Sequence, residues 1–241
     1  CLKRNKDVFS EKPMAFSLQQ AQKLNSLKRK SRLYYSIGFQ KRFDPVVYYA
    51  KKYINNVINN KKYGNINSIK FYNRTFKTSI KRPKHKKPKE SRKERLEEWS
   101  SKSKYLKNPN VIDWIYNNLS HDINLINYFF DISKIKIKNV FINDSNILLE
   151  LKHLSTTIYL EGKKSIKKDW DEGIDFIFDK GTINLKMPFM FSKKNSYFKF
   201  KPKNKSKTVD LCKKNKFRNI SREQINYFIK KFFYNKKNLQ N

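Results

Sequence analysis

Apolar residues recur at three- and four-residue steps in four stretches of the chain, which predicts four amphipathic helices. The first, residues 17–30, opens with a Ser-Leu-Gln-Gln capping box. The second begins at Pro45, the third runs over residues 109–130, and the last begins at Ser221. Each has an inward apolar stripe, so we expect every helix to pack on a common layer.

Strict alternation of apolar and polar residues dominates the stretch between the third and fourth helices, which is typical of an antiparallel sheet with one solvated face. Asp179-Lys-Gly181 predicts a hairpin turn between two of these strands. We also expect strands over residues 1–9, 33–37 and 65–76. The predicted fold class is α+β, a large open, mostly antiparallel sheet with helices packed on one face. The alternating positions are Ile135, Ile137 and Phe141 opposite Lys134, Lys136 and Lys138, then Ile147, Leu149, Leu151, Ile158, Leu160, Ile174, Phe176, Phe178, Ile183, Leu185 and Met187.

His121 is the candidate for chemistry within the third helix. It falls beside an apolar stripe formed by Ile112, Ile115, Leu119, Ile123 and Ile126, and Asn117 lies one turn earlier, within side-chain reach. The pattern is compatible with a polar site, but a histidine packed under a sheet is the more common reason for such a pattern. The acidic residues Asp169, Asp171 and Glu172 are interpreted as structural, at the entry to the hairpin. The sequence carries no P-loop, CxxC, HExxH or nucleophile-elbow motif.

The net charge of +36 is extreme for a folded chain of 241 residues and favours a polyanionic partner. Residues 81–107 hold twelve Lys or Arg against four Glu, and residues 193–218 hold eleven against one Asp. Lysines there would bind RNA phosphates, with an acidic membrane surface or merely solvated loops as alternatives. The predicted RNA-binding residues are Lys81, Arg82, Lys84, Lys86, Lys87, Lys89, Arg92, Lys93, Lys199, Lys201, Lys203, Lys205, Lys207, Lys213 and Lys214.

The two cysteines, Cys1 and Cys212, lack the spacing of a metal site, and no run of 18 apolar residues could span a membrane. A reducing compartment is therefore expected, either an organelle such as the mitochondrion or the cytoplasm.

Six segments, taken in order, resemble blocks of the Gfo/Idh/MocA oxidoreductases. They are KDVFSEKPMAFSLQQAQKL, SIGFQKRFDPVVYYAKKYI, YGNINSIKF, NNLSHDINLINYFF, DWDEGIDFIFDKGTINLKMPF and FRNISREQINYFIKKF. The resemblance implies an NAD(P)-dependent enzyme with a nucleotide-binding domain and a sheet domain for substrate and oligomer contacts. It would make Lys12 and His121 catalytic, and it places Asn117 where many members have aspartate.

The Gly-rich turn of that family is missing, because the five glycines, at 38, 64, 162, 173 and 181, never form a GxG. Residues 1–45 are therefore interpreted as a residual nucleotide-domain segment, the remnant of a Rossmann edge. Residues 46–241 would be the family's C-terminal domain, with basic insertions at 81–107 and 193–218. The chain would then be a degenerate member of the family.

Two functions are compatible with these observations. The main hypothesis is a non-catalytic structural RNA-binding component of a ribonucleoprotein, an organellar (mitochondrial) ribosomal protein derived from an oxidoreductase. Its partners would be rRNA and neighbouring proteins, and it would need no cofactor. The alternative is an NAD(P)-dependent oxidoreductase acting on a sugar-like substrate, with the cofactor domain missing from this chain. A third option is a scaffold that forms a sheet-mediated dimer.

Overall fold

The computed structural model describes residues 1–15, 17–31, 33–75, 115–143, 145–164, 170–189, 194–204, 207–212 and 220–239. The chain divides into two compact units. The first contains residues 1–40, 82–120 and 219–241, and the second contains residues 41–81 and 121–218. The expected assignment of residues 1–45 and 46–241 to two family domains stays a prediction.

The first unit is built on a parallel pair of short strands joined by a helix, a βαβ connection. Ser17 caps that helix by accepting a 3.2 Å hydrogen bond from the backbone N–H of Gln20, so the predicted capping box is confirmed. The ring of Phe228 packs on Phe9 and Tyr34. The strand predicted over residues 1–9 is wrong in its first half, which is a 3-10 turn. The elements are η1 (Leu2–Arg4), β1 (Val8–Ser10), α1 (Leu18–Arg29), β2 (Tyr35–Ile37), the π-helical η3 (Ile115–Leu119) and α6 (Ile220–Leu239).

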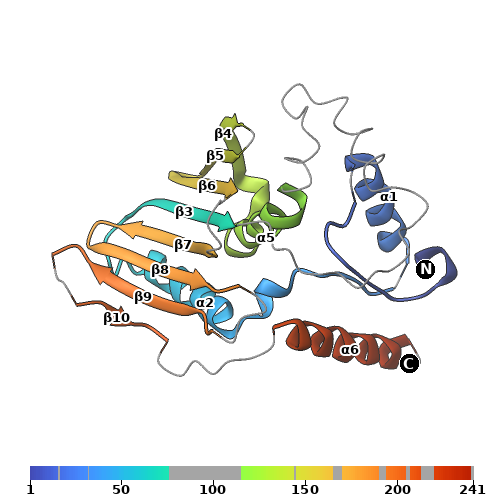
Figure 1. Ribbon diagram of the computed structural model, residues 1–241. Helices are drawn as coiled ribbons and strands as arrows, with labels where there is room; N and C mark the ends of the chain where they lie inside the picture. Colours follow the sequence, from blue (N-terminus) through green and yellow to red (C-terminus); the bar gives the residue numbers. More distant parts are fainter. Residues whose placement is uncertain are drawn as a thin grey trace. The chain divides into compact units, whose positions relative to one another are not determined.

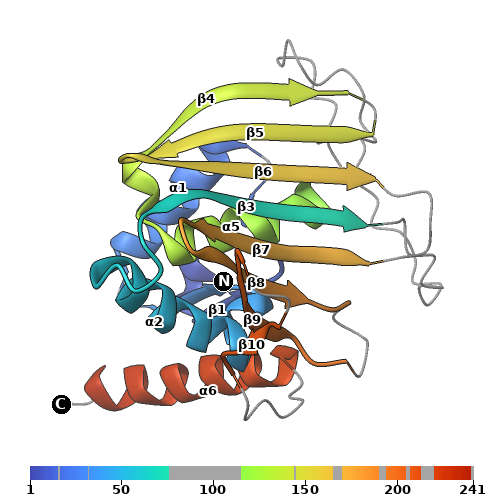
Figure 2. The same ribbon diagram turned by 90° about the vertical axis from the view of Figure 1, so that its left-hand side faces the viewer.

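The second unit is an eight-stranded sheet in the order β10-β9-β8-β7-β3-β6-β5-β4 (Figure 2). Neighbouring strands are antiparallel except for the parallel pair β3 and β6. This mixed sheet with helices confirms the predicted α+β class. The elements are η2 (Gln40–Phe43), α2 (Pro45–Asn59), β3 (Ile66–Thr75), α5 (Ser120–Phe129), η4 (Ile132–Lys134), β4 (Ile135–Ile142), β5 (Asn146–His153), β6 (Thr156–Lys164), β7 (Asp171–Phe178), β8 (Gly181–Met187), β9 (Tyr197–Pro202) and β10 (Val209–Asp210).

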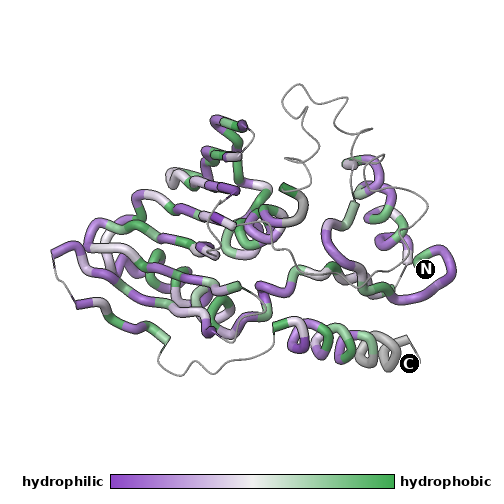
Figure 3. The backbone as a smooth tube through the Cα atoms, viewed as in Figure 1, coloured by the Kyte–Doolittle hydropathy of each residue, from purple (hydrophilic) through white to green (hydrophobic). Residues whose placement is uncertain are grey.

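Helices α2 and α5 cover one face of this sheet (Figure 1). Tyr53 of α2 packs edge-on against Phe198 at 5.5 Å between ring centroids, and Phe129 of α5 packs against Phe176 at the same distance. Hydrophobic and hydrophilic residues alternate along the strands, as Figure 3 shows. The core therefore lies between the two helices and the apolar face, and the opposite face is open. Its buried strand residues include Ile69, Phe71, Ile158, Leu160, Ile174, Phe176, Ile183, Leu185, Phe198 and Phe200.

Strand β4 departs from the predicted alternation because it contains a bulge. Its register with β5 shifts between Ile137 and Asn139, which leaves Lys138 as an extra residue. After the bulge, Phe141 pairs with Leu148 and lies on the open face, where it is 62% exposed. The prediction that Phe141 shares a face with Ile135 and Ile137 is therefore wrong.

The buried stripe of α5 also differs from the prediction. Ile123 is 40% exposed, whereas Asp122 is fully buried and His121 is buried at 7% exposure. The inward face is therefore partly polar, and those polar residues lead to the functional site.

Candidate functional site: a buried polar cluster on the sheet

Two polar residues lie side by side on the helix-covered face of the sheet. Asn73 of β3 and Glu172 of β7 are directly opposed in the antiparallel register, so their side chains project from the same face. Both are fully buried. On the other side of Asn73 the opposed residue of β6 is Gly162, which adds no side chain there. A fully buried polar pair next to a glycine is a strong departure from an apolar sheet face.

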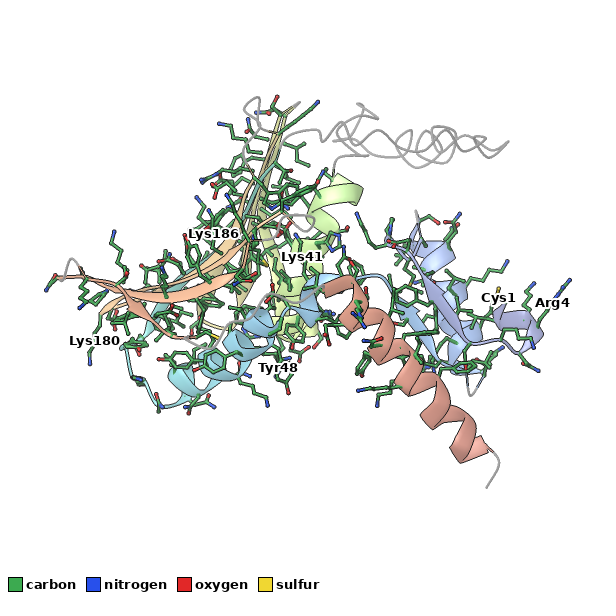
Figure 4. All side chains as sticks on the ribbon, turned by 60° about the horizontal axis from the view of Figure 1, so that its bottom comes forward. Cys1, Arg4, Lys41, Tyr48, Lys180 and Lys186 are labelled. Atoms are coloured by element: carbon green, nitrogen blue, oxygen red, sulfur yellow. The ribbon has the colours of Figure 1, made fainter. Side chains whose placement is uncertain are left out.

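Glu172 forms a buried ion pair with Lys41 of η2, whose label marks the position in Figure 4. Its other carboxylate oxygen accepts a 3.0 Å hydrogen bond from the indole Nε1 of Trp170. The Lys41 ammonium also lies 6.0 Å from the centre of the Trp170 ring. Both oxygens of Glu172 are therefore paired, which is what allows a carboxylate to be buried.

Asp122, the third residue of α5, contacts this face of the sheet from the helix side. Its Oδ2 accepts a 2.7 Å hydrogen bond from Nδ2 of Asn73. Burial raises the pKa of the Asp122 carboxyl, while the nearby Lys41 charge and the Asn73 bond act in the opposite sense. Raising the pKa favours the neutral acid.

Three oxygen atoms of this cluster are buried without a hydrogen-bond partner among the described residues. They are Oδ1 of Asp122, Oδ1 of Asn73 and Oγ1 of Thr75. Thr75 lies two residues after Asn73, so it projects from the same face of β3. Buried polar atoms in native proteins nearly always have a partner. These three atoms therefore indicate a position for a small molecule with several hydrogen-bonding groups, or for water.

His121 directly precedes Asp122 at the start of α5, so it is the chain neighbour of a cluster residue. Arg42 lies beside this helix turn. Its Nε donates to the side-chain oxygen of Asn124 and its Nη2 donates to the Asn124 carbonyl at 3.0 Å. The beginning of α5 is thus held by contacts on both sides, to β3 and to η2.

The two residues named as catalytic by the resemblance fall in different units. His121 belongs to the second unit and Lys12 to the first, where its peptide bond to Pro13 is cis. Each is described within its own unit, so a shared role for the two residues stays a prediction. Asn117 lies in the π-helical segment that leads into α5.

Four of the predicted RNA-binding residues are described. Lys199 and Lys201 of β9 point to the open face, where the Lys199 ammonium lies 5.0 Å from the Tyr197 ring centre. Lys203 and Lys207 are exposed. Lys199 and Lys201 therefore lie on the face opposite to the one that carries the polar cluster. The others, Lys81, Arg82, Lys84, Lys86, Lys87, Lys89, Arg92, Lys93, Lys205, Lys213 and Lys214, lie outside the described residues.

Lys41, Arg42, Asn73, Asp122 and Glu172 were not identified as site residues from the sequence. A signal was nevertheless present in the strand alternation. Asn73 and Thr75 continue the inward positions of Ile69 and Phe71, and Glu172 precedes the inward Ile174, so polar residues occupy core positions. Asp171 and Glu172 were treated as one acidic cluster, but consecutive strand residues face opposite ways. Asp171 pairs with Arg74 and Lys186 on the open face.

Comparison with solved structures identifies the fold. KijD10, a 3-ketoreductase from Actinomadura kijaniata crystallised with NADP and TDP-benzene, superposes with a TM-score of 0.69 at 11% identity, over 97% of this chain and 65% of its own. The dehydrogenase MviM from Clostridium difficile superposes with a TM-score of 0.61 at 14% identity, over 95% of this chain and 63% of its own. The myo-inositol 2-dehydrogenase from Lactobacillus plantarum superposes with a TM-score of 0.58 at 13% identity, over 97% of this chain and 65% of its own.

The fold is that of Gfo/Idh/MocA-type oxidoreductases. The likeness at 11–14% identity is one of fold, and the chain spans less than two thirds of the length of these neighbours. No protein-family model and no curated protein sequence matches the chain.

These neighbours overturn the main hypothesis drawn from the sequence. The chain was interpreted as a mitochondrial ribosomal protein that binds RNA, yet the structures sharing its fold are oxidoreductases. The charge of +36 led to that error, because net charge informs about association and not about fold. The alternative hypothesis, an oxidoreductase, agrees with the neighbours. Within the described residues no helix is long and apolar enough to cross a membrane, and the choice between organelle and cytoplasm stays a prediction.

Proposed function

We propose that this chain supplies the substrate-binding part of an NAD(P)-dependent oxidoreductase that acts on a sugar-like polyol. The observation that carries the proposal is the set of three buried oxygens, on Asn73, Thr75 and Asp122, that have no hydrogen-bond partner among the described residues. Asp122 directly follows His121 in α5. Neighbours of the same fold are a 3-ketoreductase crystallised with NADP and a myo-inositol dehydrogenase, which supports this substrate class.

A neutral polyol fits the cluster better than an anion does. With Asn73 already bonded to Oδ2, a protonated Asp122 carries its hydrogen on Oδ1 and donates it, while Oδ1 of Asn73 accepts. Vicinal hydroxyl groups act as donor and acceptor at once, and so satisfy both atoms. In this proposal His121, the chain neighbour of Asp122, takes or returns the proton of a bound hydroxyl as a general base or acid.

The cofactor itself does not fit the residues of this chain. A dinucleotide pyrophosphate needs a glycine-rich turn between the first strand and the helix of a βαβ unit. Between β1 and α1 this chain has Glu-Lys-Pro-Met-Ala-Phe-Ser, with no glycine. We therefore place the cofactor on a further nucleotide-binding segment outside these 241 residues, joined to the chain or supplied by a partner.

The test is calorimetric titration of the protein with myo-inositol and with glucose. Wild-type protein is expected to bind one of them, and Asn73→Ala is expected to weaken binding about 5- to 100-fold, since each lost buried hydrogen bond costs ~1–3 kcal/mol. Asn184→Ala is the matched control, because Asn184 bonds Asp175 on the opposite face of the same sheet. Absence of polyol binding, or equal effects of both variants, would contradict the proposal.

A degenerate member of the fold would retain the binding site and lack the reaction. The two cases separate when NADP and a nucleotide-binding partner are added to protein that binds the polyol. Reduction of NADP, followed at its near-ultraviolet absorbance and lost in His121→Asn, indicates an enzyme. Polyol binding without any reduction indicates the degenerate form.

A further inference from the structure

We propose that Arg42 is a positioning residue that fixes the first turn of α5, and with it the orientation of His121. The inference deepens the proposed function, on which it rests, by naming a residue that acts on His121 without touching the substrate. Arg42 is the arginine of the Arg-Phe-x-Pro turn in the second of the six family-like segments, and the sequence assigned it no role.

Arg42 donates two hydrogen bonds to one residue of α5. Its guanidinium donates to the side-chain oxygen and to the backbone carbonyl of Asn124, and its centre lies 5.3 Å from the ring of Tyr128 one turn later. Asn124 follows His121 by three residues, so the two side chains are neighbours on one helix face. A shift of Arg42 therefore moves the helix turn that carries His121.

The η2 segment that carries Arg42 is itself bonded to the sheet. Lys41, the preceding residue, is held in the buried ion pair with Glu172 of β7. On the other side of α5, Asp122 is bonded to Asn73, and Asn73 lies opposite Glu172 in the register. These contacts form a closed ring through η2, β7, β3 and α5, and His121 directly precedes Asp122, where the ring meets α5.

External anchoring matters because the helix before α5 is not α-helical. Residues Ile115–Leu119 form a π-helix, a rare i→i+5 arrangement that is often found at functional sites. The start of α5, where His121 lies, is therefore not the continuation of a regular α-helix. Contacts from Arg42 and Asn73 constrain it from outside the helix.

Arginine is suited to this role and lysine is not. The planar guanidinium donates two bonds in fixed directions to two oxygens, whereas an ammonium group of the same charge has no such fork. Arg42→Lys therefore keeps the charge and most of the aliphatic side chain, and it removes the paired hydrogen bonds to Asn124. Arg74→Lys is the matched control, because Arg74 also makes several bonds, to Glu161 and Asp171, but on the open face of the sheet.

The first readout is the ¹⁵N-coupled imidazole spectrum, in which His121 is assigned by its loss in His121→Asn. Arg42→Lys is expected to shift the His121 resonance and leave His153 in place, while Arg74→Lys leaves both unchanged. An unshifted His121 in Arg42→Lys, or an equal shift in Arg74→Lys, would overturn the proposal.

The second readout is kinetic and uses the protein together with its nucleotide-binding partner. Displacement of a proton-transferring group by about 1 Å costs on the order of 100-fold in rate. Arg42→Lys is therefore expected to lower kcat about 10- to 100-fold with little change in KM for the polyol. If the wild-type protein neither binds nor oxidises a polyol, the proposed function fails, and the imidazole spectra still decide whether Arg42 positions His121.

Discussion

Asn73 and Glu172 lie directly opposite each other on β3 and β7, and each is bonded to a residue from outside the sheet. Asn73 holds Asp122 of α5, and Glu172 holds Lys41 of η2. One cross-strand pair therefore fixes two separate segments on the same face. Because both residues are fully buried, each of these contacts is made away from water, where an unmatched polar group is costly.

Glu172→Gln is expected to destabilise the protein strongly, by ~3–5 kcal/mol, because it leaves the Lys41 ammonium buried without its counter-charge. The measurement is urea unfolding followed by circular dichroism. Asp171→Asn is the control, since Asp171 is the adjacent residue but lies about one-third exposed among cations on the open face. It is expected to cost less than ~1 kcal/mol. Equal losses in the two variants would show that the Lys41 pair is not the cause.

Asp122→Asn is expected to become progressively more stable relative to the wild-type protein as the pH rises from 3.8, the ordinary value of the Asp carboxyl pKa, toward the raised folded-state pKa of Asp122. Burial raises the folded-state pKa of Asp122 above its usual 3.8, so its favourable contribution is present at low pH and is lost as pH rises through the folded value. Asparagine imitates the neutral acid and does not ionise. The measurement is the difference between the unfolding free energies of the two proteins at several pH values. A difference that does not change with pH would mean that the pKa of Asp122 is the same in the folded and the unfolded protein.

Most elements of the fold could be predicted from the sequence because their apolar spacing is regular. Helix α2 buries Val46, Val47, Ala50, Ile54 and Val57, which form the inward apolar stripe expected of a helix beginning at Pro45. Strands β5 to β8 follow a clean alternation, and Gly181 at φ 152° closes the predicted hairpin turn.

The site could not be predicted, because its contacts join residues far apart in sequence. Lys41 and Glu172 are 131 residues apart, and Asn73 and Asp122 are 49 apart. Periodicity assigns a face to each residue within its own element, but the pairing of faces depends on strand order, and β7 lies beside β3 only in the folded sheet. The polar residues at core positions of β3 and β7 were the one local signal.

Arg74→Met is expected to remove much of the acid lability of the second unit. Hydrogen bonds from Arg74, assisted by Lys70, lower the pKa of Glu161 to about 2. A lowered folded-state pKa gives stability that is present above the unfolded value of 4.5 and is lost as pH falls through the folded value. The wild-type protein is expected to lose more stability than Arg74→Met between pH 4.5 and 2. Both side chains are partly exposed, so 1 M salt is expected to reduce the difference. Parallel curves for the two proteins would exclude Glu161 as the acid-sensitive group.

Deletion of Lys138 is expected to leave the sheet intact, although it shortens a strand by one residue. Lys138 is the extra residue of the β4 bulge, and the pairs on either side of it, Ile137 with Leu151 and Asn139 with Glu150, already follow the register of a regular strand. Removing it straightens β4 and moves no side chain to the other face. Deletion of Lys152 from β5 is the control, because it shifts a regular strand by one position and reverses the facing of its neighbours. Thermal unfolding is expected to change by a few degrees in the first deletion and to show loss of the cooperative transition in the second. Loss of the cooperative transition in both deletions would show that the pairing of β4 with β5 requires Lys138.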